Sequence, residues 1–145
     1  MRSDTPLLLI ITLLIAGCAA SSFPDLEKQE LADICGFDAD RMEVIRQGNA
    51  VEYKLQKTEM STQSVWIEVG PYSQKHFSDV RQIQEDNGLN YYPDLGDEAM
   101  VWTKHHLFRT MLLSDGDQTY RIRSIIDGCN DDEGLKRIAR AILDS

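Results

Sequence analysis

Cysteine and histidine are the residues whose chemistry could define a site in this chain, and there are three of each. Cys35 and Cys129 can form a disulfide or supply a catalytic thiol, but neither lies in a motif whose histidine would activate a thiolate. His76 falls in a predicted helix. His105 and His106 are neighbours in a predicted extended segment, so they point to opposite faces and cannot readily share one ion. The sequence therefore predicts no catalytic thiol, no metal site and no cofactor.

The third cysteine, Cys18, follows a short apolar run over residues 7–15. A membrane-spanning helix needs about 20 apolar residues. This run is far shorter and ends in small residues, which is typical of a processed export signal. The order apolar, small, small, cysteine resembles a bacterial lipobox. The resemblance implies that Cys18 is lipidated and becomes the first residue of the mature chain, with residues 1–17 as signal peptide and residues 18–22 as tether.

The residue after Cys18 bears on the expected location. Ala19 stands there rather than aspartate, and by resemblance to lipoproteins of diderm bacteria this favours the outer membrane, facing the periplasm. A single acyl chain binds a membrane only marginally, and the several chains of a mature lipoprotein would anchor it stably. The alternative is an ordinary secretory peptide cut near Ala20, which would remove Cys18.

Export has a consequence for the other two cysteines. An exported chain folds in an oxidising compartment, where a cysteine pair is usually a disulfide. We therefore predict a bond between Cys35 and Cys129, which would span nearly all of the predicted domain, residues 23–145. On the chain-entropy model such a bond contributes roughly 4–5 kcal/mol to the free energy of unfolding.

The chain is acidic, with 15 basic residues, 24 acidic residues and a formal net charge of −9. Removing residues 1–17 takes away one Arg and one Asp, so the mature chain keeps this charge. The balance argues against nucleic acid as a partner and against electrostatic binding to anionic lipid. Solubility is the simplest interpretation of the charge, and attraction of a basic partner is the alternative.

Hydrophobic periodicity and turn residues predict an α+β domain, with helices on one face of a mostly antiparallel sheet of about five strands. The last helix is amphipathic, and Asn130 and Glu133 are expected to form its capping box. Residues 89–96 are interpreted as a loop, with a short extended piece within it as the alternative. The predicted helices cover about residues 25–35, 38–47, 73–87 and 130–143, and the predicted strands cover residues 51–56, 65–69, 99–103, 108–113 and 119–126.

Period-two alternation divides the predicted sheet into two faces. The side chains expected to face inward are Val51, Tyr53, Leu55, Val65, Ile67, Val69, Tyr120 and Ile122. Trp66, Arg121 and Arg123 fall on the other face, and tryptophan and arginine are frequent at interface hot spots. These three residues are our candidate binding face. The alternative is that a loop such as Tyr91–Tyr92 covers Trp66, which would then belong to a second core layer.

The segment Asp94–Trp102 reads Asp-Leu-Gly-Asp-Glu-Ala-Met-Val-Trp. It is similar to a recurring Gly-Leu-Gly-Asp-Glu-Ala-aromatic segment of small bacterial secreted lipoproteins, in which it enters a strand followed by a hairpin and a C-terminal helix. Some of these proteins resemble the PsbP/Mog1-type α/β sandwich, and some the extracellular sensor modules of mycobacterial kinases. The resemblance implies a fold and a location, and it carries over no catalytic residue.

Acidic residues in two places invite a metal interpretation, because hard cations bind carboxylates. Asp94, Asp97 and Glu98 form one group, and the acidic residues between positions 127 and 133 form the other. Neither group has the spacing of a known cation loop. Turn formation and helix capping use the same residue types, so we predict structural roles for both groups.

These observations favour a non-catalytic binding or accessory lipoprotein of the bacterial cell envelope, which acts on a protein or envelope component through the open sheet face. An inhibitor or immunity protein against a basic enzyme is a more specific version, supported by the charge and the anchor. An envelope hydrolase is the alternative from another class. Its candidate pair, Ser73 and His76, is better explained as a helix cap and an exposed helix residue.

Overall fold

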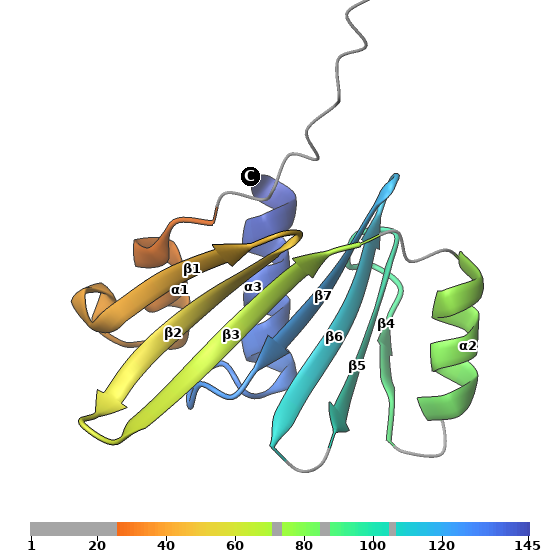
Figure 1. The fold of residues 1–145 in the computed structure, drawn as a ribbon. Coiled ribbons are helices and arrows are strands. Elements are labelled where there is room, and N and C mark those ends of the chain that lie inside the picture. Colours follow the sequence, from red (N-terminus) through yellow and green to blue (C-terminus); the bar gives the residue numbers. More distant parts are fainter. Residues whose placement is uncertain (1–25, 71–73, 85–87, 105–106) are drawn as a thin grey trace, which may run out of the picture.

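A computed structural model of the chain describes residues 26–70, 74–84, 88–104 and 107–145. The described residues form one antiparallel sheet of seven strands, in the order β1-β2-β3-β7-β6-β5-β4 (Figure 1). The strands are β1 (Met42–Gln47), β2 (Ala50–Thr58), β3 (Ser61–Val69), β4 (Asn90–Tyr92), β5 (Glu98–Lys104), β6 (Phe108–Asp115) and β7 (Gln118–Ser124). The helices are α1 (Lys28–Cys35), α2 (Gln74–Gln84) and α3 (Asp132–Asp144), and a short 3₁₀ helix, η1 (Ala39–Arg41), precedes β1.

The α+β class and the C-terminal helix are confirmed, but the sheet has seven strands rather than about five. The second predicted helix is wrong. Asp38 does begin a helical turn, and its side chain accepts a hydrogen bond from the Asp40 amide at 2.9 Å. The turn lasts only three residues, and Met42–Gln47 then pair with β2 across a two-residue turn at Gly48–Asn49. β4, the other additional strand, lies in the segment predicted as a loop, where a short extended piece was the alternative.

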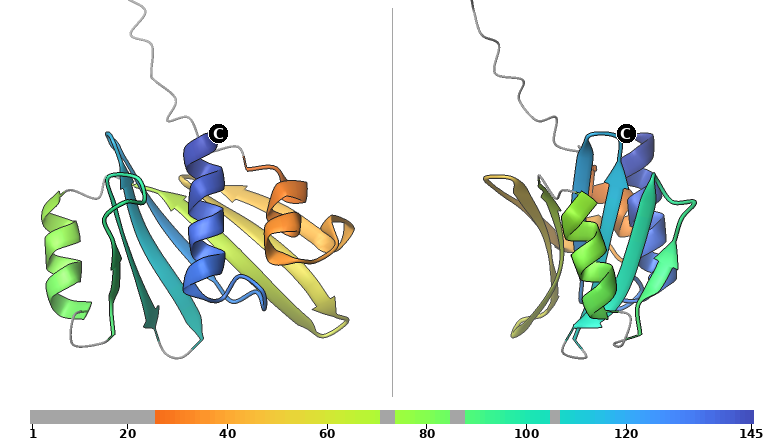
Figure 2. Two further views of the ribbon diagram at one scale, coloured as in Figure 1. Left: turned by 180° about the vertical axis from the view of Figure 1, so that it is seen from behind. Right: turned by 90° about the vertical axis from the view of Figure 1, so that its right-hand side faces the viewer.

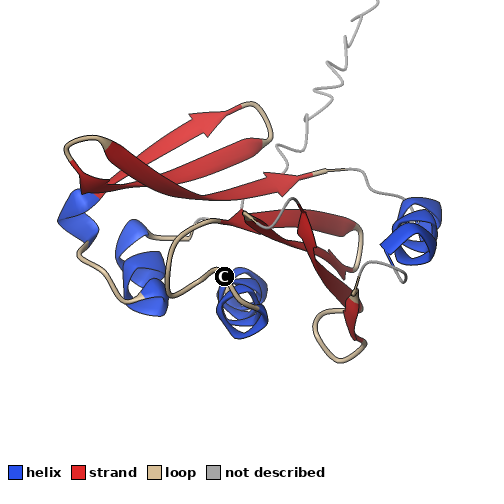
Figure 3. Cartoon of the chain, turned by 90° about the horizontal axis from the view of Figure 1, so that it is seen from below, coloured by secondary structure: helices blue, strands red, loops and turns tan. Residues whose placement is uncertain are grey.

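Helices cover the two faces of the sheet unequally. α1 and α3 lie against one face (Figure 2), and α3 contributes Leu135, Ile138 and Ile142 to the main core. α2 lies on the opposite side, at the β4 end of the sheet (Figure 3), where Phe77 packs in a second buried cluster with side chains of β5 and β6. The prediction that all helices lie on one face is therefore wrong for α2.

The reason for the second cluster lies in the composition of β5 and β6. Both strands carry consecutive buried apolar residues, Met100–Trp102 in β5 and Met111–Leu113 in β6. Because successive side chains of a strand point to opposite faces, a continuous apolar run needs cover on both sides. In contrast, β2, β3 and β7 alternate, and all eight side chains predicted to face the core from these strands are buried.

The predicted disulfide is present between Cys35 and Cys129, whose Cα atoms are 5.1 Å apart. It joins the end of α1 to the loop that precedes α3. Gly128, beside this bond, has φ +87°, and a Cβ atom there would collide with the carbonyl oxygen of Cys35. The close approach of the two backbones therefore requires glycine at this position.

The predicted capping box of the last helix is wrong by one residue. Asp131 is the cap, and its side chain accepts a hydrogen bond from the Gly134 amide at 2.6 Å. The side chain of Asn130 instead accepts a hydrogen bond from the backbone amide of Arg109 at 3.1 Å. This shift places Asp132 in the first turn of α3, where it faces the sheet.

Several residues singled out in the sequence lie outside the described ranges. They include the predicted signal peptide, residues 1–17, the tether, residues 18–22, and with it Cys18. Ser73, His105 and His106 also lie outside these ranges. Among the helices that the structure describes, none combines the length and apolar character that crossing a bilayer requires.

Candidate binding surface

The half of the sheet formed by β1, β2, β3 and β7 has no described helix on the side opposite α3 (Figure 3). We call this surface, together with the adjoining start of β6, the open face. Its larger side chains are Ile45, Glu52, Lys54, Trp66, Glu68, Phe108, Arg121 and Arg123.

The pairing of β3 with β7 brings the predicted residues together. Trp66 is directly opposite Arg123, and Glu68 is directly opposite Arg121. Residues opposite each other in an antiparallel pair point to the same face. The structure therefore places Trp66, Arg121 and Arg123 on one face. Ile67, which follows Trp66 along β3, is fully buried on the α3 side.

Trp66 is half-buried and packs against its neighbours on the open face. Its ring centroid lies 5.8 Å from that of Phe108, with the two planes tilted by 54°. The guanidinium carbon of Arg123 lies 5.5 Å from the Trp66 ring centroid, within the range of a cation–π contact. Tyr91 and Tyr92, which we considered as a cover for Trp66, belong to β4 at the far edge of the sheet.

The two arginines of this cluster differ in their partners. Arg121 donates to the Glu68 carboxylate, with its Nε 3.1 Å from Oε2, and forms an ion pair with it. Arg123 is half-buried, and among the described residues its charged group contacts the Trp66 ring rather than a carboxylate. A guanidinium has five N–H donors, so Arg123 presents donors that no described carboxylate satisfies.

A buried hydroxyl group lies next to Arg123. Thr110 on β6 is directly opposite Arg123 and is only 3% exposed. Its Oγ1 has no hydrogen-bond partner among the described residues. Leaving a buried polar group unsatisfied costs about 1–3 kcal/mol. The Arg123 guanidinium thus lacks a carboxylate partner, and the neighbouring Thr110 hydroxyl lacks a hydrogen-bond partner, among the described residues.

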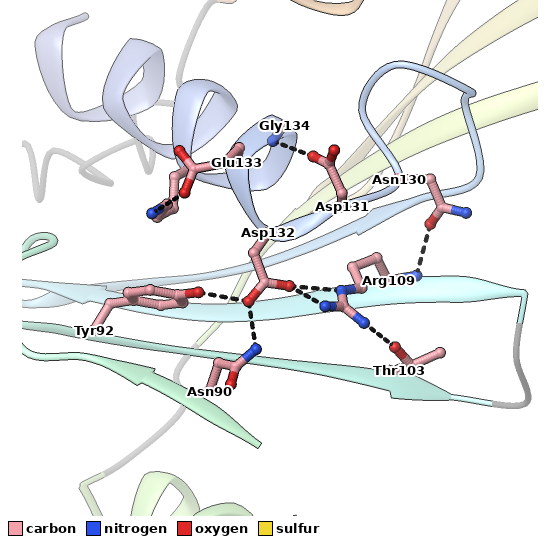
Figure 4. Close-up of polar contacts among 10 residues, drawn as sticks. Asn90, Tyr92, Thr103, Arg109, Asn130, Asp131, Asp132, Glu133 and Gly134 are labelled. Atoms are coloured by element: carbon pink, nitrogen blue, oxygen red, sulfur yellow. Dashed lines mark hydrogen bonds and ion pairs between the residues drawn. The ribbon is translucent and has the colours of Figure 1, made fainter. Parts of the chain in front are cut away.

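A second polar cluster joins α3 to the other face of the sheet (Figure 4). The Asp132 carboxylate accepts a hydrogen bond from Arg109 Nε at 2.7 Å through Oδ1, and one from Asn90 at 2.6 Å through Oδ2. Oδ2 also accepts from the Tyr92 hydroxyl. Arg109 in turn donates to the Thr103 hydroxyl. Both carboxylate oxygens are therefore engaged, and the cluster connects the start of α3 with β4, β5 and β6.

The environment of this cluster shifts two pKa values in opposite directions. Burial raises the pKa of the Tyr92 hydroxyl, and its hydrogen bond to Asp132 adds to this, so the pKa reaches about 12. Burial also acts to raise the pKa of Asp132, but hydrogen bonds from Tyr92, Asn90 and Arg109 outweigh it and hold that pKa below its usual value. Tyr92 therefore stays protonated and Asp132 ionised over a wide pH range. We call this cluster around Asp132 the clamp, because it holds the start of α3 against the sheet.

The clamp was not predicted from the sequence, because Asp132 is also a good residue for capping a helix. One signal could have revealed it. Arg109 directly precedes Thr110 in β6, and alternation places Arg109 on the core side of the strand, opposite Ser124. A charged residue at an inward position needs a counter-charge, and the acidic start of α3 offers one.

Asp97 and Glu98, two carboxylates of the Asp94–Trp102 segment, have separate structural partners. Asp97 accepts a hydrogen bond from the Gly116 amide at 2.8 Å, and its own amide donates to the Ser114 carbonyl at 2.7 Å. Glu98 accepts from Arg81 on α2 and from a tyrosine of β4. Within the described ranges, no group of three or more His, Cys, Asp or Glu side chains could hold a metal ion.

An open cavity of about 320 Å³ lies beside the disulfide. Phe37, Leu55 and Ile126 supply its apolar lining, and Arg41 and Lys57 its cationic groups. Arg41 donates to two backbone carbonyls of β2, and Lys57 is paired with Asp127. Because both cationic groups already have partners within the chain, the cavity is a weaker candidate for binding a ligand than the open face.

Comparison with known proteins provides no functional assignment for this chain. No protein-family model, no curated protein and no solved structure matches this chain. The similarity of the segment Asp94–Trp102 to secreted lipoproteins stays a prediction.

Proposed function

We propose that this protein is a lipid-anchored component of the bacterial cell envelope that acts as a non-catalytic binding module through its open face. One observation carries the choice of surface: Arg123 stacks on Trp66 and has no carboxylate partner in the described chain. The export and anchoring part of the proposal is supported by the apolar run before Cys18 and by the Cys35–Cys129 bond, which is typical of an oxidising compartment.

The chemistry of the cluster indicates what a partner would contribute. A partner carboxylate could accept two parallel hydrogen bonds from Arg123, the geometry in which arginine binds carboxylates best. Trp66 and Phe108 would add apolar contact area next to this polar contact. Aromatic side chains and arginine in one partly buried patch are typical of interface hot spots. A carboxylate-bearing protein or envelope component is therefore the proposed partner.

The proposal is tested by capture from envelope extracts with matched variants of the full chain as bait. Arg123→Gln removes the unpaired charge, whereas Arg140→Gln removes an exposed charge on α3, on the other side of the sheet. We expect wild type and Arg140→Gln to recover the same partner, and Arg123→Gln to lose most of it. Equal recovery by all three proteins would show that the open face is not the binding surface.

The net charge of −9 favours a second candidate, an inhibitor or immunity protein against a basic enzyme. The two candidates differ in the residues that they require. Binding of a basic enzyme would depend on exposed carboxylates and would be insensitive to loss of Arg123. The same set of variants therefore distinguishes them.

A further inference from the structure

The two edges of the sheet differ in length. β4 forms one edge and has three residues, whereas β1 forms the other and has six. The outer side of β1 carries no described strand or helix along it (Figure 1). An exposed edge presents unpaired backbone groups that can bind another strand, and natural proteins usually protect such edges with proline, charged side chains (lysine above all), a bulge, a covering loop or a very short strand. β4 has the last of these protections.

β1 is twice as long as β4, and its protection consists of two charged side chains, Glu43 and Arg46. Its sequence, Met-Glu-Val-Ile-Arg-Gln, contains no proline or lysine, and it pairs with β2 in unbroken register from Met42 to Gln47. Val44 and Ile45 are β-branched and half-buried, one on each face of the strand. β-branched residues favour a strand, and further burial of such side chains is favourable. Apart from these two charges, the edge is suited in shape and composition to accept another strand.

The direction of the backbone groups follows from the hairpin. Gln47 and Ala50 flank a two-residue turn and form the first hydrogen-bonded pair, and such pairs alternate along an antiparallel ladder. Ile45 and Glu43 therefore bond toward β2. The N–H and C=O of Val44 point away from it, toward the outer side of the edge.

We propose that β1 pairs antiparallel with β1 of a second copy of this chain, centred on Val44, and that the two sheets join into one. In this register Val44 lies opposite Val44 of the second copy, and Glu43 lies opposite its Ile45. Met42 lies opposite its Arg46. No like charges are directly opposed, so the strand is complementary to itself.

The same geometry favours a second copy over an open chain of molecules. A β1–β4 contact would be limited to the three residues of β4 and would not close on itself. The β1–β1 contact is related by a two-fold axis and closes at two copies. Because this axis is perpendicular to the sheet, both open faces lie on the same side of the dimer, and two Trp66–Arg123 clusters would be available to one partner.

The charge of the chain gives this dimer a characteristic salt dependence. Two copies that each carry −9 repel one another. Salt screens this repulsion over about 10 Å at 0.1 M. Pairing through backbone hydrogen bonds and apolar contacts should therefore strengthen as the salt concentration rises, whereas association with a basic partner would weaken.

The test is sedimentation equilibrium of the full chain in a nonionic detergent with micelles in excess, at low and high salt. Val44→Pro removes the outward N–H without removing a bond to β2, because proline is tolerated where an edge N–H faces solvent. Met60→Ser is the control, since Met60 is 98% exposed at the tip of the β2–β3 hairpin and could cause nonspecific association. We expect wild type and Met60→Ser to be dimers that tighten several-fold with salt, and Val44→Pro to be a folded monomer.

Two results would overturn the proposal. One is a wild-type chain that stays monomeric at every protein and salt concentration. The other is a Val44→Pro variant that remains dimeric while its circular dichroism spectrum and melting curve match wild type. Should Val44→Pro fail to fold, Val44→Lys places a charge on the same edge without altering the backbone, and it should give the same monomer. Val44 is remote from Arg123, so failure of this pairing leaves the capture experiment unaffected.

Discussion

Arg121 and Arg123 are two residues apart on β7 and point to the same face, yet their surroundings differ. Arg121 has the Glu68 carboxylate as its partner, and Arg123 has the ring of Trp66. An ion pair that is satisfied within the chain offers little to a ligand. An unpaired guanidinium over an indole keeps its donors available, so Arg123 is the residue on which the functional proposal depends.

Asp132 shows the opposite situation, a charged residue whose partners all lie within the chain. We expect Asp132→Asn to lower the free energy of unfolding by about 1–3 kcal/mol, because Arg109 is left partly buried without its counter-charge. Urea denaturation measures this loss. Asp144→Asn, at an exposed position near the end of the same helix, should change stability by less than about 0.5 kcal/mol. Equal stability of the two variants would remove the clamp from this account.

The pKa of Tyr92, raised to about 12, predicts a change at alkaline pH. A tyrosine whose pKa is higher in the folded than in the unfolded chain stabilises the fold fully below about pH 10. This contribution is lost as pH rises from 10 toward 12. The melting temperature of Tyr92→Phe should therefore fall less steeply with pH than that of wild type over this range. The lowered pKa of Asp132 acts at the other end, where stability is lost as pH falls below the usual aspartate value.

At the scale of elements, alternation and periodicity predicted most of the fold. The period of two in β2, β3 and β7 identified the buried face, and the apolar stripe of α3 identified its packing side. β1 was mistaken for a helix because Met42, Val44 and Ile45 fit either period over so short a segment. Pairing with β2 decides between them, and a single sequence does not reveal that pairing.

The position of α2 could not be derived from its own residues. The relevant signal was in β5 and β6, whose consecutive apolar residues require cover on both faces. The cap of α3 was displaced by one residue because Asn130, Asp131 and Asp132 are all good capping residues. The local sequence left this choice open, and contacts of Asn130 and Asp132 with Arg109 settled it.

The disulfide predicts a measurable role for the contact between α1 and α3. It links residues separated by 94 positions, and the chain-entropy model assigns such a loop roughly 4–5 kcal/mol. We expect the double variant Cys35→Ala, Cys129→Ala to lose most of this free energy of unfolding in urea, with or without reductant. Wild type should lose the same amount when a reductant is added. A wild-type protein that is indifferent to reductant would contradict a bond in the exported protein.

At the scale of the whole molecule, the predicted lipid anchor gives one testable expectation. Cys18→Ser should abolish lipidation, so the protein should move from the detergent phase to the aqueous phase and lose the mass of the acyl chains. The measurement is phase partitioning followed by mass spectrometry of the expressed full chain. An unchanged mass and an unchanged partition would contradict the lipobox interpretation of Cys18.

The central claim is that the open face binds a partner rather than completing the core, and Trp66 tests it most directly. The measurement is the affinity of Trp66→Ala for the captured partner, together with its melting temperature. We expect a loss of affinity of about 10-fold or more, the range of a hot-spot residue, with a melting temperature within a few degrees of wild type. A Trp66→Ala protein that binds as tightly as wild type, or that no longer folds, would contradict the claim and return Trp66 to the core.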